Sequence, residues 1–100
     1  MEKNSLFYMA NLHPEIGRLF SFFDSQKIEA ANNAKIRALG IVDKILSFKD
    51  IKPAGREEWN VIKNFILGYD KLDPYERNIL EKYAEPFSYK FMNQYQRTSM

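Results

Sequence analysis

The chain of 100 residues contains no cysteine, one histidine, four glycines and four prolines. Without cysteine it can form no disulfide, thiol nucleophile or cysteine metal site, which is consistent with a reducing compartment. No apolar run approaches the roughly 20 residues of a membrane-spanning helix, and the first 15 residues lack the apolar segment of a secretory signal. We therefore expect a cytoplasmic protein with no membrane partner.

Catalytic patterns are equally scarce. His13 stands directly before Pro14, where we expect it to have a capping or surface role. Glu57 and Glu58 are adjacent, so on a helix their side chains point about 100° apart and cannot act as a pair. The four glycines are scattered and form no phosphate loop. We expect no catalytic residue, metal or cofactor, and a protein that is not an enzyme.

The longest uninterrupted pattern in the chain is residues 25–49, which contain no proline. Wound at 100° per residue, this stretch gathers its apolar residues on about half of its circumference, which indicates contact with more than one neighbour. At ~1.5 Å per residue it is roughly 36 Å long. We predict a long helix, with Asp24 or Ser25 as its N-cap, around which the domain is organised. Its apolar side contains Ala31, Ala34, Ala38, Leu39, Val42, Ile45 and Leu46.

Proline and glycine divide the rest of the chain. Pro14 suits the first turn of a helix over 14–23, and residues 1–12 show no clear period. Residues 50–55 read as a connection before a helix over 56–68, with Gly68 at its end. A helix over 74–85 follows, in which Asp73 and Glu76 form a capping box. We expect Pro86 to end that helix.

The last segment, 87–96, admits a helix or a strand, and we favour a short helix because a single strand has no partner. Residues 1–5 and 97–100 are expected to be frayed. The sequence therefore predicts an all-α single domain over 1–100, a bundle of four or five helices. The predicted core is Ile16, Leu19, Phe20, Phe23, Ile28, Ala38, Leu39, Val42, Ile45, Leu46, Trp59, Ile62, Phe65, Ile66, Ile79, Leu80 and Tyr83.

Some apolar residues fall outside the buried faces of their helices. Ile36 interrupts the polar side of the long helix one turn before Gly40, which would allow a partner's backbone to approach closely. Single exposed aliphatic residues are common, but a cluster of them marks an interface. We predict a partner-binding patch and thus a regulator, inhibitor or adaptor that binds another protein or a second copy of itself. The predicted partner-binding residues are Phe22, Ile36, Gly40, Leu67 and Tyr89.

Charge is distributed unevenly along the chain and supports an alternative function. Residues 25–56 contain seven basic and three acidic residues, whereas residues 57–85 contain four basic and seven acidic residues. These segments can complement each other within the domain or between copies, or the basic one can bind nucleic acid. For nucleic acid the predicted residues are Arg37, Lys44, Lys52 and Arg56, although the acidic pair after Arg56 opposes contact with phosphates.

Overall fold

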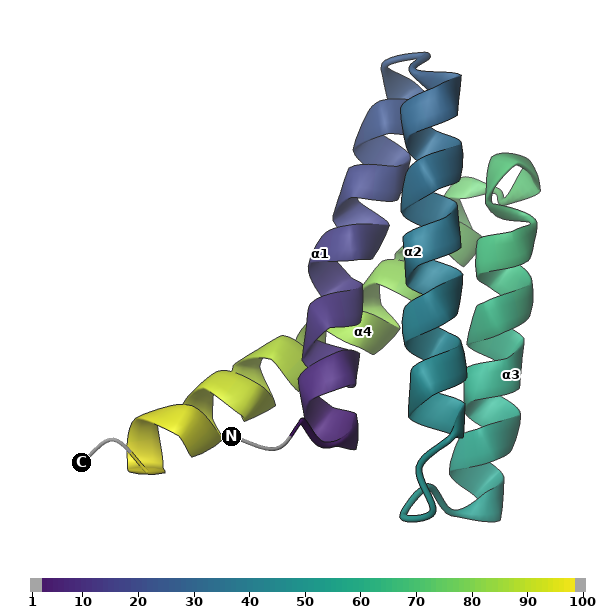
Figure 1. Cartoon of the computed structure of the whole chain (residues 1–100). Helices are drawn as coiled ribbons and strands as arrows, with labels where there is room; N and C mark the ends of the chain where they lie inside the picture. The colour runs from purple at the N-terminus through teal and green to yellow at the C-terminus, as the bar shows by residue number, and fades with distance from the viewer. Residues whose placement is uncertain (1–2, 99–100) are drawn as a thin grey trace.

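The computed structural model describes the backbone of residues 3–98 and the side chains of residues 3–90. It contains the α-helices α1 (Ser5–Asp24), α2 (Ile28–Leu46), α3 (Pro53–Leu67) and α4 (Pro74–Thr98), and the short 3-10 helix η1 (Tyr69–Lys71) (Figure 1). No strand occurs among the described residues. The predicted all-α fold is confirmed.

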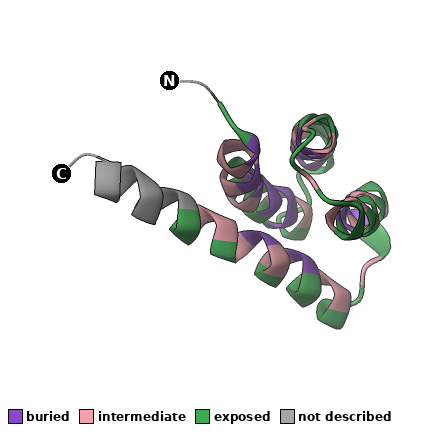
Figure 2. Cartoon of the chain, turned by 90° about the horizontal axis from the view of Figure 1, so that it is seen from below, coloured by how far each residue is buried: buried purple, intermediate pink, exposed green. Residues whose placement is uncertain are grey.

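Three helices form a layer, and the fourth crosses behind it. α1, α2 and α3 lie side by side with α2 in the middle, while α4 runs obliquely across the back of the layer and packs against α1 and α3 (Figure 1). Seen from below, α2 lies on the side of the layer away from α4 (Figure 2). One face of α2 is therefore directed away from the rest of the domain.

α1 begins well before the predicted start at Pro14. Asn4 caps the helix by accepting a hydrogen bond from the backbone N–H of Phe7 at 2.9 Å, and Pro14 lies inside the helix. Proline has no N–H to donate to the carbonyl four residues earlier, which belongs to Ala10. The Ser88 hydroxyl of α4 donates to that carbonyl at 3.1 Å. Tertiary contact thus supplies the hydrogen bond that the proline removes.

α2 matches the predicted long helix but is shorter at both ends. Asp24 is the last residue of α1, and Lys27 occupies the N-cap position of α2 without a side-chain hydrogen bond, so the prediction of Asp24 or Ser25 as its cap was wrong. Between the two helices Gln26 adopts a φ of 61°, which reverses the chain. The side of α2 that packs inward contains Ala31, Ala34 and Ala38, all fully buried, and these small side chains allow α1 to approach closely.

The ends of α3 and α4 agree with some of the predicted helix start and stop positions and differ from others. α3 starts at Pro53, three residues before the predicted start, and Gly68 is its C-cap as predicted. The predicted capping box is confirmed: the Asp73 carboxylate accepts from the Glu76 N–H at 2.7 Å, and Glu76 accepts from the Asp73 N–H at 3.1 Å. Pro86 does not end α4, which continues to Thr98, so the predicted separate helix over 87–96 is part of α4.

The core follows the predicted stripes with two exceptions. Ile28 is 50% exposed in the first turn of α2, and Ile79 is 37% exposed on α4, so both were wrongly placed in the core. Residues on the margins of the stripes are partly buried and pack against the core: Phe23, Leu39, Leu46, Phe65 and Tyr83. Met9 and Leu12 are buried because α1 extends further toward the N-terminus than predicted.

Candidate interaction surface

The face of α2 directed away from α4 is the best candidate for a binding surface. We call it the α2 outer face. Ile36 and Gly40 lie two residues on either side of the fully buried Ala38, a rotation of about 200° on a helix, so both lie opposite the buried stripe. All members of this face are exposed: Glu29, Asn33, Ile36, Gly40, Asp43 and Ser47.

Ile36 and Gly40 form a knob and a notch on this face. Ile36 is 63% exposed, although isoleucine is among the residues most often buried. A Cβ atom built on Gly40 would have no neighbouring atom within 4 Å, so the position is open above the helix backbone. The predicted adjacency of these two residues on one exposed face is therefore present in the structure.

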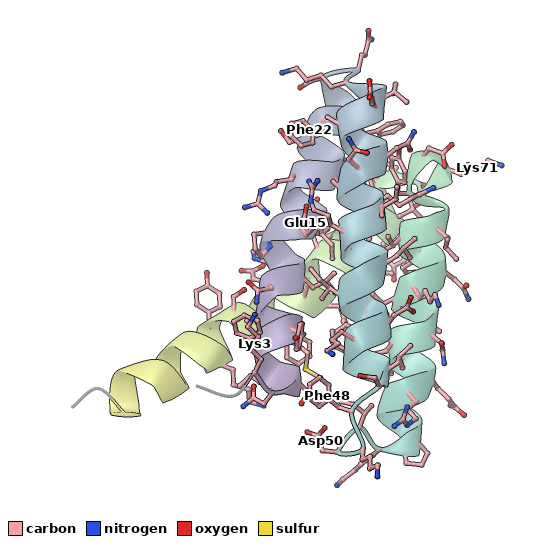
Figure 3. The ribbon with its side chains drawn as sticks, viewed as in Figure 1. Lys3, Glu15, Phe22, Phe48, Asp50 and Lys71 are labelled. Atoms are coloured by element: carbon pink, nitrogen blue, oxygen red, sulfur yellow. The ribbon has the colours of Figure 1, made fainter. Side chains whose placement is uncertain are left out.

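On the α1 side, the outer face is bordered by a cluster of three charged residues. The Glu15 carboxylate of α1 accepts from Arg37 Nε at 2.7 Å and from Arg18 Nη1 at 3.1 Å. The Glu15 side chain is only 9% exposed, whereas both arginines are about half exposed. Figure 3 shows Glu15 where α1 borders α2. Arg37 is thus held by the domain itself.

On the α3 side, a second ion pair borders the outer face. Lys63 Nζ lies 2.8 Å from the Asp43 carboxylate. On the α1 side, Lys44 lies over the ring of Tyr8, with Nζ 5.9 Å from the ring centroid. Arg37, Asp43 and Lys44, which flank Ile36 and Gly40 along α2, therefore already have partners within the chain.

The other residues predicted for partner binding do not join this face. Phe22 is partly buried and packs against the core. Tyr89 is exposed but lies nine residues after the buried Leu80, on the opposite side of α4, which itself crosses behind the layer. Leu67 is exposed at the last residue of α3. Of the five predicted residues, only Ile36 and Gly40 are shown to share one face.

The residues predicted for nucleic-acid binding are divided between internal and exposed roles. Arg56 donates to the carbonyls of Leu46 and Phe48 at 2.6 and 2.8 Å, so its guanidinium satisfies the carbonyl groups at the end of α2. Arg37 is held by Glu15. Lys44 and Lys52 remain exposed, and Lys52 is the N-cap residue of α3. The four side chains do not form one free basic surface.

A second concentration of aromatic residues lies where α3 meets α4. Trp59 packs edge-on against Tyr83 at 5.1 Å between ring centroids and lies 5.6 Å from Phe87. The Tyr83 hydroxyl donates to Glu58 at 2.8 Å, and burial together with this carboxylate raises the pKa of Tyr83. An open hollow nearby is lined by residues of α4 alone, namely Lys82, Glu85, Pro86, Phe87, Tyr89 and Lys90. The aromatic cluster joins two helices, and within the hollow Lys82 and Glu85 form an ion pair with each other at 3.5 Å.

The sequence interpretation did not identify Glu15, the most buried charged residue beside this face. Placing the helix start at Pro14 put Glu15 in a first turn, where an acidic residue needs no other explanation. The available signal was its position beside the buried Ile16, with Arg18 three residues later. Its second partner, Arg37, comes from another helix and could not be foreseen from local spacing.

Two kinds of feature are absent from the described part of the chain. Among them, no group of three or more histidine, aspartate and glutamate side chains is placed to hold a metal ion. None of the helices, as far as they are described, combines the length and apolar character needed to cross a membrane. Comparisons with protein-family models, with curated proteins and with solved structures give no match.

Proposed function

We propose that this chain is a non-enzymatic cytoplasmic module that binds another protein chain through the α2 outer face. The observation that carries the proposal is the position of Ile36: an aliphatic side chain, 63% exposed, at the centre of a helix face that points away from the rest of the domain. We expect the role of the chain to be that of a regulator, inhibitor or adaptor.

The surroundings of Ile36 favour burial by a partner. Covering the exposed part of this side chain would contribute about 1–2 kcal/mol, in proportion to the ~1.5–3 kcal/mol of a fully buried aliphatic side chain. Charged groups on the same face would oppose burial if they were left without partners. Asp43 on this face is already paired with Lys63, and Arg37 at its border is paired with Glu15. The other charged member of the face, Glu29, lies in the first turn of α2, away from Ile36 and Gly40. The face therefore has an apolar centre and a polar rim, the usual anatomy of an interface.

A photo-cross-linking amino acid at position 36 tests the proposal in cells that express the protein. The matched control carries the same probe at Tyr75, which is 72% exposed in the first turn of α4. We expect irradiation to yield a discrete protein adduct from position 36 and none from position 75. An equal pattern from both positions, or no adduct from position 36, would contradict the proposal.

A further inference from the structure

Resting on the proposed function, we infer that the partner of the α2 outer face is a second copy of this chain, packed antiparallel about a two-fold axis midway between Ile36 and Gly40. The positions on this face are 29, 33, 36, 40, 43 and 47, which alternate in steps of four and three residues. Such alternation keeps a single stripe in contact along a second helix. The stripe spans nearly all of α2.

The centre of the stripe is complementary to itself. In the antiparallel register each Ile36 lies over Gly40 of the other copy, since the two positions are equally distant from the axis. The space above Gly40 is open, with no atom within 4 Å of a built Cβ, so it can receive a branched side chain. A two-fold arrangement forms this contact twice.

The polar residues distinguish the antiparallel from the parallel arrangement. A parallel pair would set Glu29 against Glu29 and Asp43 against Asp43, which places like charges opposite each other. In the antiparallel pair Asp43 meets the amide of Asn33, and Glu29 meets Ser47 beside Lys44. The two helix dipoles also oppose each other in this orientation. The charge pattern therefore selects the antiparallel pair.

The ion pair between Arg37 and Glu15 affects the charge near the two-fold axis. Arg37 flanks the two-fold axis, so the two copies bring their Arg37 side chains toward each other. Each Arg37 is held by Glu15 at 2.7 Å. The carboxylate also pairs with Arg18, so it offsets only part of the positive charge that the two copies bring together. Because the apolar contact is limited to Ile36 and Gly40, the dimer is a weak and reversible one, populated at high protein concentration.

The absence of cysteine from the chain gives a direct test of this register. Two single variants, Asn33→Cys and Asp43→Cys, are oxidised separately and as an equal mixture of purified full-length proteins. In the antiparallel register position 33 lies opposite position 43, whereas identical positions are separated by about 15 Å along the helix, ten residues at ~1.5 Å each. A disulfide requires Cα atoms within about 7 Å. We expect a cross-linked dimer in the mixture and little in either variant alone.

Each other outcome of the disulfide and photo-cross-linking experiments would contradict a different part of the proposal. Cross-linking of each variant with itself would overturn the antiparallel register, and no cross-link in any sample would overturn the second copy as partner. If position 36 nevertheless forms an adduct with a different protein, the proposed function stands and this inference fails. If position 36 forms no adduct at all, both fail.

Two glycine variants provide an independent measurement that needs no disulfide geometry. Gly40→Gln fills the notch, and Gly17→Gln adds the same side chain on α1, where a built Cβ also has no neighbour within 4 Å. We expect sedimentation equilibrium to show a dimer dissociation constant raised about tenfold or more by Gly40→Gln and unchanged by Gly17→Gln. Equal constants for the two variants would overturn the packing of Ile36 onto Gly40.

Discussion

The contact between Ser88 and Ala10 gives a quantitative prediction about how this fold keeps a proline inside its first helix. Pro14 removes the N–H that would reach the Ala10 carbonyl, and the Ser88 hydroxyl replaces it at 3.1 Å. Ser88→Ala leaves this partly buried carbonyl without that donor. A lost hydrogen bond costs about 0.5–1.5 kcal/mol, and an unsatisfied buried group about 1–3 kcal/mol. We expect a loss of about 1.5 kcal/mol.

The matched background is Pro14→Ala, because it restores an N–H within reach of the same carbonyl. Ser88→Ala in that background should cost only about 0.5 kcal/mol, which gives a coupling of about 1 kcal/mol in a double-mutant cycle. Urea unfolding, followed by circular dichroism and by the fluorescence of the single tryptophan Trp59, measures all four proteins. An equal cost of Ser88→Ala in both backgrounds would refute the explanation of how Pro14 is accommodated.

Three further predictions test individual contacts. Gly17→Ala should raise stability by about 0.5–1 kcal/mol, since Gly17 lies in a helix with open space around it; a lower thermal midpoint would contradict this. The hydrogen bond from Arg77 holds the pKa of Asp24 below 3.8, so its stabilising effect is present above that pH and disappears as the pH falls through the lowered pKa. Asp24→Asn should therefore lower the thermal midpoint at neutral pH and leave it unchanged in strong acid, and a pH-independent difference would refute the assignment. Arg56→Lys should cost about 1–2 kcal/mol in urea unfolding, because lysine cannot reach both carbonyls at the end of α2; no loss would exclude this capping role.

Patterns that repeat within one helix were predicted correctly from the sequence. The alanine stripe of α2 and the capping box at Asp73 and Glu76 depend on local spacing, and the structure contains both. The exposed position of Ile36 followed from the same reasoning, since it lies opposite the buried side of a regular helix.

Pro14 and Pro86 were predicted to mark helix ends from the neighbouring sequence, but both lie inside helices. Pro14 is retained in α1 because a serine 74 residues later supplies a hydrogen bond to Ala10. At Pro86 the carbonyl that loses its donor belongs to Lys82, and both residues are exposed, so water can take the place of the missing N–H. Neither compensation is visible in the neighbouring sequence.

The candidate surface was likewise only partly accessible to prediction. Phe22 and Tyr89 both lie outside the predicted apolar stripes of their helices. Phe22 is nevertheless partly buried against the core, whereas Tyr89 lies on the exposed side of α4. Separating these cases requires the arrangement of helices. The pairing of Arg37 with Glu15 depends on the same arrangement, because the two residues come from neighbouring helices.

Sedimentation equilibrium of Ile36→Asp tests most directly whether the α2 outer face joins two copies of the chain. The control is Val61→Asp, since Val61 is 51% exposed and lies two residues before Lys63, on the side of α3 turned away from α2. We predict that the wild-type chain and Val61→Asp form dimers as concentration rises, whereas Ile36→Asp remains a monomer with a nearly unchanged thermal midpoint. Dimerisation of Ile36→Asp to the same extent as the wild-type chain, or a monomeric wild-type chain throughout, would contradict the account.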